Sequence, residues 1–195
     1  MLLPFRPENY GPKVAAILAL AGESATDDGA AGARPMDLFP RACTSEAARE
    51  ALMASDAREL FPHARDPESA LAGLLLYFSC LNEAHELIHR FETSDGAYWH
   101  GIMHRMEGDA FNAGYWFRYV RSHPVFPALA GEAAQLGYAP GPAWDPFAFI
   151  RFCKAATPGS AEDHLARRVQ LAEWQLLFDY CAAAHTRPQS GAAAR

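Results

Sequence analysis

Four histidines form the pattern in this sequence that is most capable of chemistry. His85 and His89 are four residues apart, and so are His100 and His104, so each pair lies on one face of its predicted helix. The residues between the pairs, 93–96, predict a short turn. Two helices joined by such a turn form an antiparallel hairpin, in which residues whose numbers have equal sums lie at about the same height. His85 is therefore expected opposite His104, and His89 opposite His100.

The same four imidazoles predict a metal site, because neutral imidazole is the commonest metal ligand and helical bundles hold metals between facing helices. His85, His100 and His104 supply three ligands and His89 a fourth. His85 continues the apolar stripe of its helix, which predicts that it points inward. Three nitrogens with one open position suit catalytic zinc, whereas a site with an added carboxylate also admits iron, manganese or nickel. The available carboxylates, as ligand or general base, are those of Glu86 and Glu107.

Two other interpretations of the histidines stay open. In one, they bond to carboxylates and carbonyls at a tight hairpin and serve only the fold. In the other, they line a site for an organic ligand without a metal. The segment His85-Glu86-Leu87-Ile88-His89 also matches H-E-x-x-H, the zinc-binding pattern of metallopeptidases. The metzincin continuation requires glycine at 92 and histidine at 95, where this chain has Glu92 and Asp95, so the sequence disfavours peptidase chemistry.

A second group of polar residues follows the histidines. One interpretation is a network of salt bridges and hydrogen bonds that sets the angle of the hairpin. The other is a pocket in which an arginine fork binds a carboxylate or phosphate, with aromatic walls from Trp99, Tyr115 and Trp116. The candidate ligand-binding residues are Arg105, Asp109, Asn112, Tyr115 and Arg118.

Composition limits the class of protein. The chain has 195 residues, and its net charge of -6 disfavours a nucleic-acid partner, which a basic stripe would indicate. No apolar run approaches the length that a membrane helix needs, so we expect a cytoplasmic protein without a membrane partner. The four cysteines are far apart in sequence, and we expect all of them to be reduced and to bind no metal. They are Cys43, Cys80, Cys153 and Cys181.

The elements that position these residues are all predicted to be helices. Capping residues and apolar periodicity indicate an all-α, single-domain bundle of about seven helices over residues 1–186. The longest are expected over 67–91, after the Asp66-Pro67 start, and over 161–184, after Ser160. Asp95 is the expected N-cap of the helix that carries His100. Residues 22–34 are expected to form a mobile loop and 187–195 a disordered tail.

The segment around the hairpin resembles two known patterns. It is similar to one tetratricopeptide unit, with Gly101, Ala113 and Phe117 at the expected spacing, although Ala97 replaces an aromatic residue and Pro124 comes one residue early. It also resembles an uncharacterised family of bacterial proteins, with relatives in fungi, whose members carry WHxxxHRxExD followed by NAxYWFRxVxxHPVF. The first pattern matches here at Trp99, His100, His104, Arg105, Glu107 and Asp109, and the second over Asn112–Phe126.

Three functions from different classes remain at this stage. The first is a metal-dependent, hydrolase-like enzyme that acts on a small molecule, with the histidines as ligands. The second is a binding protein for a small ligand. The third is a tetratricopeptide-like interaction module in which the histidines only pack, and fold analogy alone does not choose among the three.

Overall fold

The fold is all-α, as predicted. A computed structural model describes residues 5–22, 36–90 and 93–184, and within these ranges it contains helices and a single isolated β-bridge but no sheet. The expected loop over 22–34, apart from Gly22, and the expected tail over 187–195 lie outside the described residues. The elements are η1 (Pro7–Tyr10), α1 (Pro12–Ala19), α2 (Glu46–Met53), α3 (Ala57–Leu60), α4 (Pro67–Tyr77), α5 (Leu81–Ile88), α6 (Ser94–Met106), α7 (Ala110–Val120), α8 (Phe126–Leu136), α9 (Pro146–Ala155) and α10 (Ala161–Ala182).

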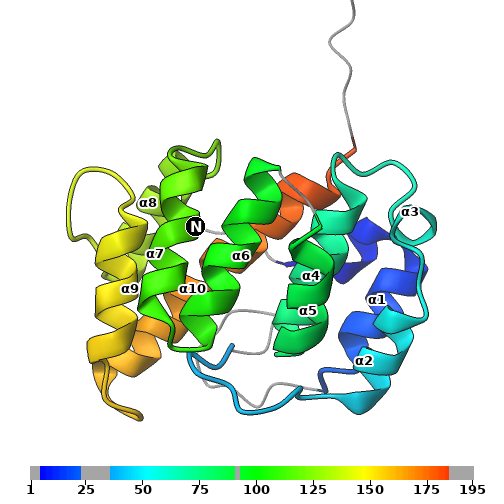
Figure 1. Cartoon of the computed structure of the whole chain (residues 1–195), viewed down its shortest axis with the longest axis horizontal. Helices are drawn as coiled ribbons and strands as arrows, with labels where there is room; N and C mark the ends of the chain where they lie inside the picture. Colours follow the sequence, from blue (N-terminus) through cyan, green and yellow to red (C-terminus); the bar gives the residue numbers. More distant parts are fainter. Residues whose placement is uncertain (1–4, 23–35, 91–92, 185–195) are drawn as a thin grey trace, which may run out of the picture.

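Helix α10 is the element against which the others are arranged. It runs behind α6 and α7 and contacts α4, α8 and α9, with α7–α9 at one end of the molecule and α1–α3 at the other (Figure 1). Trp174, Leu177 and Phe178 are fully buried. The buried surface of α10 is wider than the single apolar stripe of an amphipathic helix, since Gln170 and Glu173 are buried as well. None of the described helices is long and apolar enough to cross a membrane.

The helix predicted over 67–91 is broken, so that prediction was wrong in its middle. Helix α4 starts as expected, with Asp66 accepting a hydrogen bond from the Ser69 N–H, but α5 begins only at Leu81. Between them Ser79 is left-handed, with φ 60°, and the Cys80 N–H donates to the Leu75 carbonyl at 2.9 Å. The Ser79 N–H donates to the Leu76 carbonyl at 2.9 Å, and the two bonds together form a Schellman motif that ends α4. Glycine normally marks this ending, and serine leaves no sign of it in the sequence.

The start of α6 also differs from the expected one. Its N-cap is Thr93, whose hydroxyl accepts from the Gly96 N–H at 2.9 Å, and not Asp95. The carboxylate of Asp95 is instead buried and accepts a hydrogen bond from His123 Nε2 at 2.9 Å. Asp95 therefore ties the start of α6 to the segment that follows α7.

Helices α6 and α7 form an antiparallel hairpin around a short turn. Gly108 in the turn has φ 79°, a conformation that glycine adopts without strain. Gly101 allows the two helices to approach closely, because a Cβ atom there would lie 2.8 Å from the ring of Phe117. The close approach of Phe117 explains why position 101 has no side chain.

The prediction of four reduced cysteines was wrong for two of them. Cys43 and Cys80 form a disulfide across a sequence separation of 37, whereas Cys153 and Cys181 are free and buried. The break after α4 places Cys80 against the segment that precedes α2, where the Thr44 N–H donates to the Phe78 carbonyl at 2.7 Å. This proximity depends on tertiary structure that the cysteine spacing does not reveal.

Candidate metal centre

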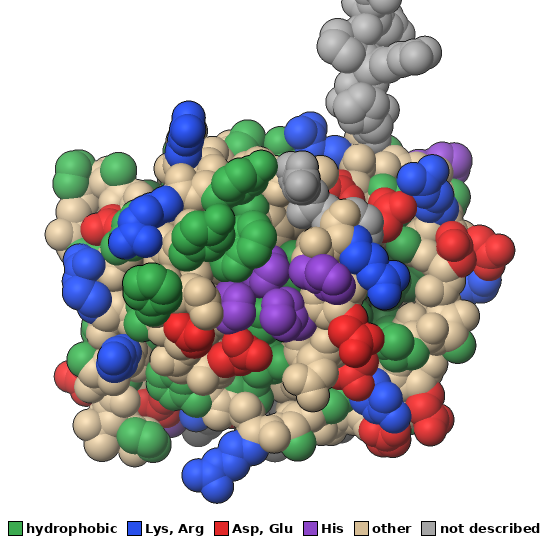
Figure 2. Space-filling model, viewed as in Figure 1, with side chains coloured by type: hydrophobic (Ala, Val, Ile, Leu, Met, Phe, Trp, Pro, Cys, Tyr) green, Lys and Arg blue, Asp and Glu red, His purple; other side chains and the backbone are tan. Residues whose placement is uncertain are grey.

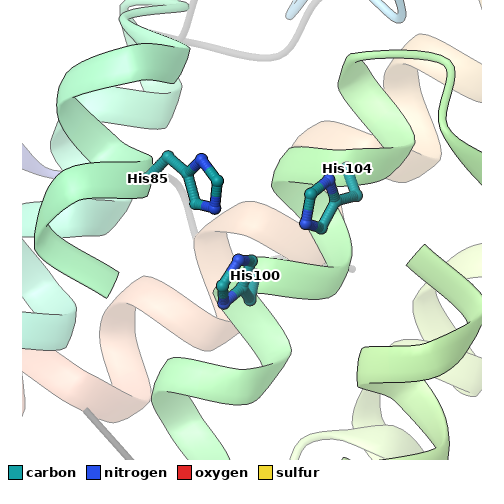
Figure 3. A group of neighbouring side chains, drawn as sticks. All are labelled: His85, His100 and His104. Carbon is teal, nitrogen blue, oxygen red and sulfur yellow. The ribbon is translucent and has the colours of Figure 1, made fainter. Parts of the chain in front are cut away.

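Three histidine rings converge between α5 and α6. His85 comes from α5, and His100 and His104 come from successive turns of α6, with the rings pointing toward one another (Figure 3). One nitrogen of each ring lies within 4.8 Å of the corresponding nitrogens of the other two. The predicted proximity of His85 and His104 is confirmed, with ring centroids 5.4 Å apart.

The register of the two helices differs slightly from the equal-height expectation. The ring of His85 lies 4.9 Å from that of His100 and 5.4 Å from that of His104, so it faces the gap between the two. The rings of His100 and His104 are stacked, with an interplanar angle of 13°. The reason is that α5 ends at Ile88 and α6 already begins at Ser94, earlier than the predicted turn over 93–96 implies. This shifts the residue of α6 at the height of His85 from His104 toward His100.

The cluster lies at the surface with a buried side and an open side. His100 and His104 are 3% and 8% exposed. His85 is exposed, and the prediction that it points into the core was wrong, because α5 buries Ala84 and Ile88 instead. Figure 2 shows histidine side chains at the centre of one face of the molecule. An ion held by the three rings would therefore be within reach of solvent and of a small molecule.

A hydrogen bond orients the ring of His104, and an aromatic stack orients that of His100. His104 Nδ1 lies 2.8 Å from the carboxylate of Glu107, so its Nε2 carries the lone pair that is free to bind. His100 stacks on Trp116, with ring centroids 3.9 Å apart and an angle of 14°. Its Nδ1 is buried and has no hydrogen-bond partner among the residues that the structure describes. A buried polar atom without a partner is costly, and a bound ligand is one way to satisfy it.

Burial and neighbouring histidines keep two rings of the cluster neutral. The pKa of His100 is lowered to about 3, mainly by burial and also by the neighbouring His104, His85 and His89. Burial, followed by the proximity of His104, also lowers the pKa of His85. These rings are therefore unprotonated near neutral pH, and unprotonated imidazole is the form that binds a metal.

The structure leaves His89 and Glu86 outside this group. His89 is exposed, its ring is 6.2 Å from that of His85, and its Nδ1 lies 3.1 Å from the backbone carbonyl of His85. Glu86 is exposed on α5. The partners that gather around His85 are thus the two histidines of α6, and not the second histidine of the H-E-x-x-H segment.

The predicted ligand-binding residues do not share one pocket. Arg105 is 2% exposed and points inward, where it forms an ion pair with Glu173. Asp109 caps α7 and accepts from the backbone N–H of Asn112 at 3.0 Å and from its side-chain amide at 2.8 Å. The two that remain at the surface are Tyr115 and Arg118, which line the same pocket on the outer face of α7.

Sequence reasoning missed Glu173, which determines where Arg105 points. It lies fully buried in α10, and its second carboxylate oxygen accepts from the Tyr98 hydroxyl at 3.0 Å. The available sign was a pair of polar residues, Gln170 and Glu173, three apart on a helix with apolar residues on several sides. A buried glutamate such as Glu173 needs an internal partner of the opposite charge, and a buried glutamine needs hydrogen-bond partners.

Comparison of the chain with protein-family models, with curated proteins and with solved structures found no match.

Proposed function

We propose that this protein is a metal-dependent enzyme of hydrolase-like chemistry that acts on a small molecule, with His85, His100 and His104 as the metal ligands. The observation that supports this most directly is the approach of three ligand nitrogens to within 4.8 Å of one another. In a tetrahedral zinc site, bonds of about 2.0–2.1 Å separate two ligand nitrogens by roughly 3.3 Å. The closure that binding requires is small, and His85 is exposed and free to turn toward the other two rings.

The donor set favours zinc over the other candidate cations. Neutral imidazoles bind zinc, iron and nickel well, whereas manganese prefers oxygen ligands. Three protein ligands with an open fourth position are typical of catalytic zinc, and structural zinc sites have four protein ligands. Since the cluster is open to solvent on the side of His85, the fourth position is available to water or substrate.

The residues around the cluster then take distinct roles. A bound zinc ion supplies Lewis acidity and lowers the pKa of a bound water to about 7. Glu107 holds the ring of His104 through Nδ1, so we assign it the role of orienting that ligand and not of a general base. Trp116 holds the ring of His100 by stacking on it. Glu86, exposed on α5, keeps the predicted role of general base only if a substrate brings it toward the metal.

The alternative is a small-ligand binding protein that uses the histidines without a metal. The Nδ1 of His100 is buried and has no hydrogen-bond partner among the described residues. It favours this alternative as much as it favours a metal site, because an organic hydrogen-bond donor would satisfy that atom equally well.

Metal analysis distinguishes the two. Protein purified without a histidine tag and titrated with zinc is expected to bind one ion per chain. His104→Ala should abolish this binding while leaving the helical circular dichroism unchanged, since His104 lies at the edge of the core. His89→Ala is the matched control, because it removes a neighbouring histidine that lies outside the cluster.

Two results would count against the proposal. One is the absence of stoichiometric zinc binding at micromolar metal. The other is an equal loss of affinity in His89→Ala and His104→Ala, which would mean that any surface histidine on this face contributes alike.

A further inference from the structure

A pocket on the outer face of α7 lies next to the candidate metal centre. Its volume is about 590 Å³. It is lined by Ser94, Tyr115, Arg118, Tyr119 and Arg121, which come from the start of α6 and from the second half of α7. Of the predicted ligand-binding residues, Tyr115 and Arg118 belong to it, and its other three members were not predicted.

The aromatic wall of this pocket is continuous with the histidine cluster. Tyr115 and Tyr119 are 55% and 53% exposed, a large apolar area for surface residues. Trp116 contacts both, at ring-centroid distances of 5.4 Å and 6.2 Å, and it also stacks on the ring of His100. Figure 2 shows a hydrophobic patch that directly adjoins the histidines. A flat apolar molecule on this wall would have one end close to His100.

The pocket also carries two positive charges on a protein whose net charge is -6. Arg118 and Arg121 are exposed, and no carboxylate among the described residues forms an ion pair with either. The guanidinium group of Arg118 lies over the Phe147 ring of α9, with its carbon 5.7 Å from the ring centre. A guanidinium forks onto the two oxygens of a carboxylate or phosphate, so two of them in one pocket select an anion.

Arg121 adopts a backbone conformation that costs free energy. Its φ of 59° and ψ of -74° are close to the strained γ-turn conformation, which L residues rarely adopt. Glycine would end α7 here with less strain. Strain at a residue that lines a pocket points to a role for its side chain.

We propose that this pocket is the substrate-binding part of the same site and selects small molecules with an aromatic body and a carboxylate or phosphate group. The ring would lie against Tyr115 and Tyr119, and the anionic group would meet Arg118 and Arg121. The assignment of the bound molecule as a substrate rests on the proposed metal centre, whereas the binding itself does not. It is therefore testable on metal-free protein.

The experiment is a titration of the full-length, chelator-treated protein followed by amide NMR shifts. The probes are phenyl phosphate, benzoate, neutral benzamide and inorganic phosphate. Phenyl phosphate or benzoate should cause saturable shifts at Ser94, Tyr119 and Arg121, and the tighter of the two identifies the preferred anion. Benzamide and inorganic phosphate should each bind at least about tenfold more weakly, because each lacks one half of the recognised group.

Variants localise the binding. Arg118→Gln and Arg121→Gln should each weaken aryl-anion binding about tenfold or more, whereas Arg168→Gln, at an exposed arginine of α10, should not. Phe111→Ala should likewise leave aryl-anion binding unchanged, since Phe111 is 79% exposed on α7 but lies outside the pocket lining. Arg121→Gly is the sharpest variant, because it should lose binding while the melting temperature stays the same or rises.

The outcomes separate the two proposals. Saturable binding that depends on Arg118 and Arg121 supports the pocket whatever the zinc titration shows. Absence of aryl-anion shifts, benzamide binding as tight as that of benzoate, or an equal loss in Arg168→Gln overturns the pocket alone. If aryl anions bind and zinc does not, the metal centre fails and the pocket stands.

Discussion

Two polar clusters are built on adjacent residues of α6 and face opposite ways. His104 points to the surface, toward His85 and His100, and Arg105 points to the interior, toward α10. In the interior, Arg105 is paired with Glu173, which also accepts a hydrogen bond from Tyr98. The guanidinium lies 4.6 Å from the centre of the Phe149 ring. Both clusters consist of groups that are costly to bury.

The difference lies in what each cluster finds within the chain. The interior cluster joins a cation to an anion, so its main electrostatic requirement is met by the fold. The surface cluster joins three rings of the same kind. The proximity of His104 contributes to lowering the pKa of both His85 and His100, and among the three rings Glu107 is hydrogen-bonded only to His104. The charge of Arg105 is paired within the chain, although its Nε and Nη1 make no hydrogen bond among the described residues. A cluster whose charges are paired in this way indicates a structural role, whereas a cluster of like groups at an open surface indicates binding.

Glu173→Gln should cause the largest loss of stability. It leaves the charge of Arg105 buried without an anion, and breaking a buried pair in this way costs about 3–5 kcal/mol. The free energy of unfolding is measured by urea denaturation. The double variant Arg105→Met with Glu173→Leu should recover most of the loss, because neither charge then remains buried.

The folded fraction of Glu173→Gln should still bind zinc with unchanged affinity, since the two clusters are separate. A loss below about 1 kcal/mol would mean that water reaches Arg105 and that the interior cluster is not closed.

Glu107→Gln should affect the surface cluster alone. Loss of a carboxylate that orients a ligating histidine lowers metal affinity by about 10–100-fold. Because Glu107 is exposed, the free energy of unfolding should change by less than about 1 kcal/mol. Competition titration with a zinc chelator gives the affinity. Glu86→Gln is the control, with a change below about threefold, and an equal effect of both variants would show that only the general negative charge of this face matters.

The histidine site could be predicted in outline because its determinants are local. Spacing of four on each helix fixes two faces, and a short turn fixes which faces meet, so the proximity of His85 and His104 followed from the sequence. The helix starts at Asp66 and Ser160 followed from capping in the same way.

The remaining features depend on contacts between distant segments. The Schellman ending at Ser79 preserves the apolar periodicity on both sides, so the pattern predicted one continuous helix. The direction of Arg105 is decided by Glu173, which is 68 residues away. The disulfide between Cys43 and Cys80 likewise depends on how α2 packs beside the break. No periodicity within a single segment contains this information.

The smallest expected effect is the pH dependence of the metal-free protein. The pKa of His100 is lowered to about 3 in the folded chain, and an unfolded histidine has a pKa near 6.5. Between these values the unfolded chain binds a proton that the folded chain does not, so the free energy of unfolding falls as the pH falls. At pH 5 the loss relative to pH 7 should be at most about 2 kcal/mol.

Denaturation in the presence of a chelator at pH 7 and pH 5 measures this loss. His100→Asn should remove most of it, since asparagine does not titrate, whereas His164→Asn, at an exposed histidine of α10, should not. Added zinc should enlarge the loss in the wild-type protein, because protons then compete with the metal for the three rings. If His100→Asn and the wild type show the same pH dependence, burial does not hold His100 neutral, and the contrast between the two clusters loses its electrostatic basis.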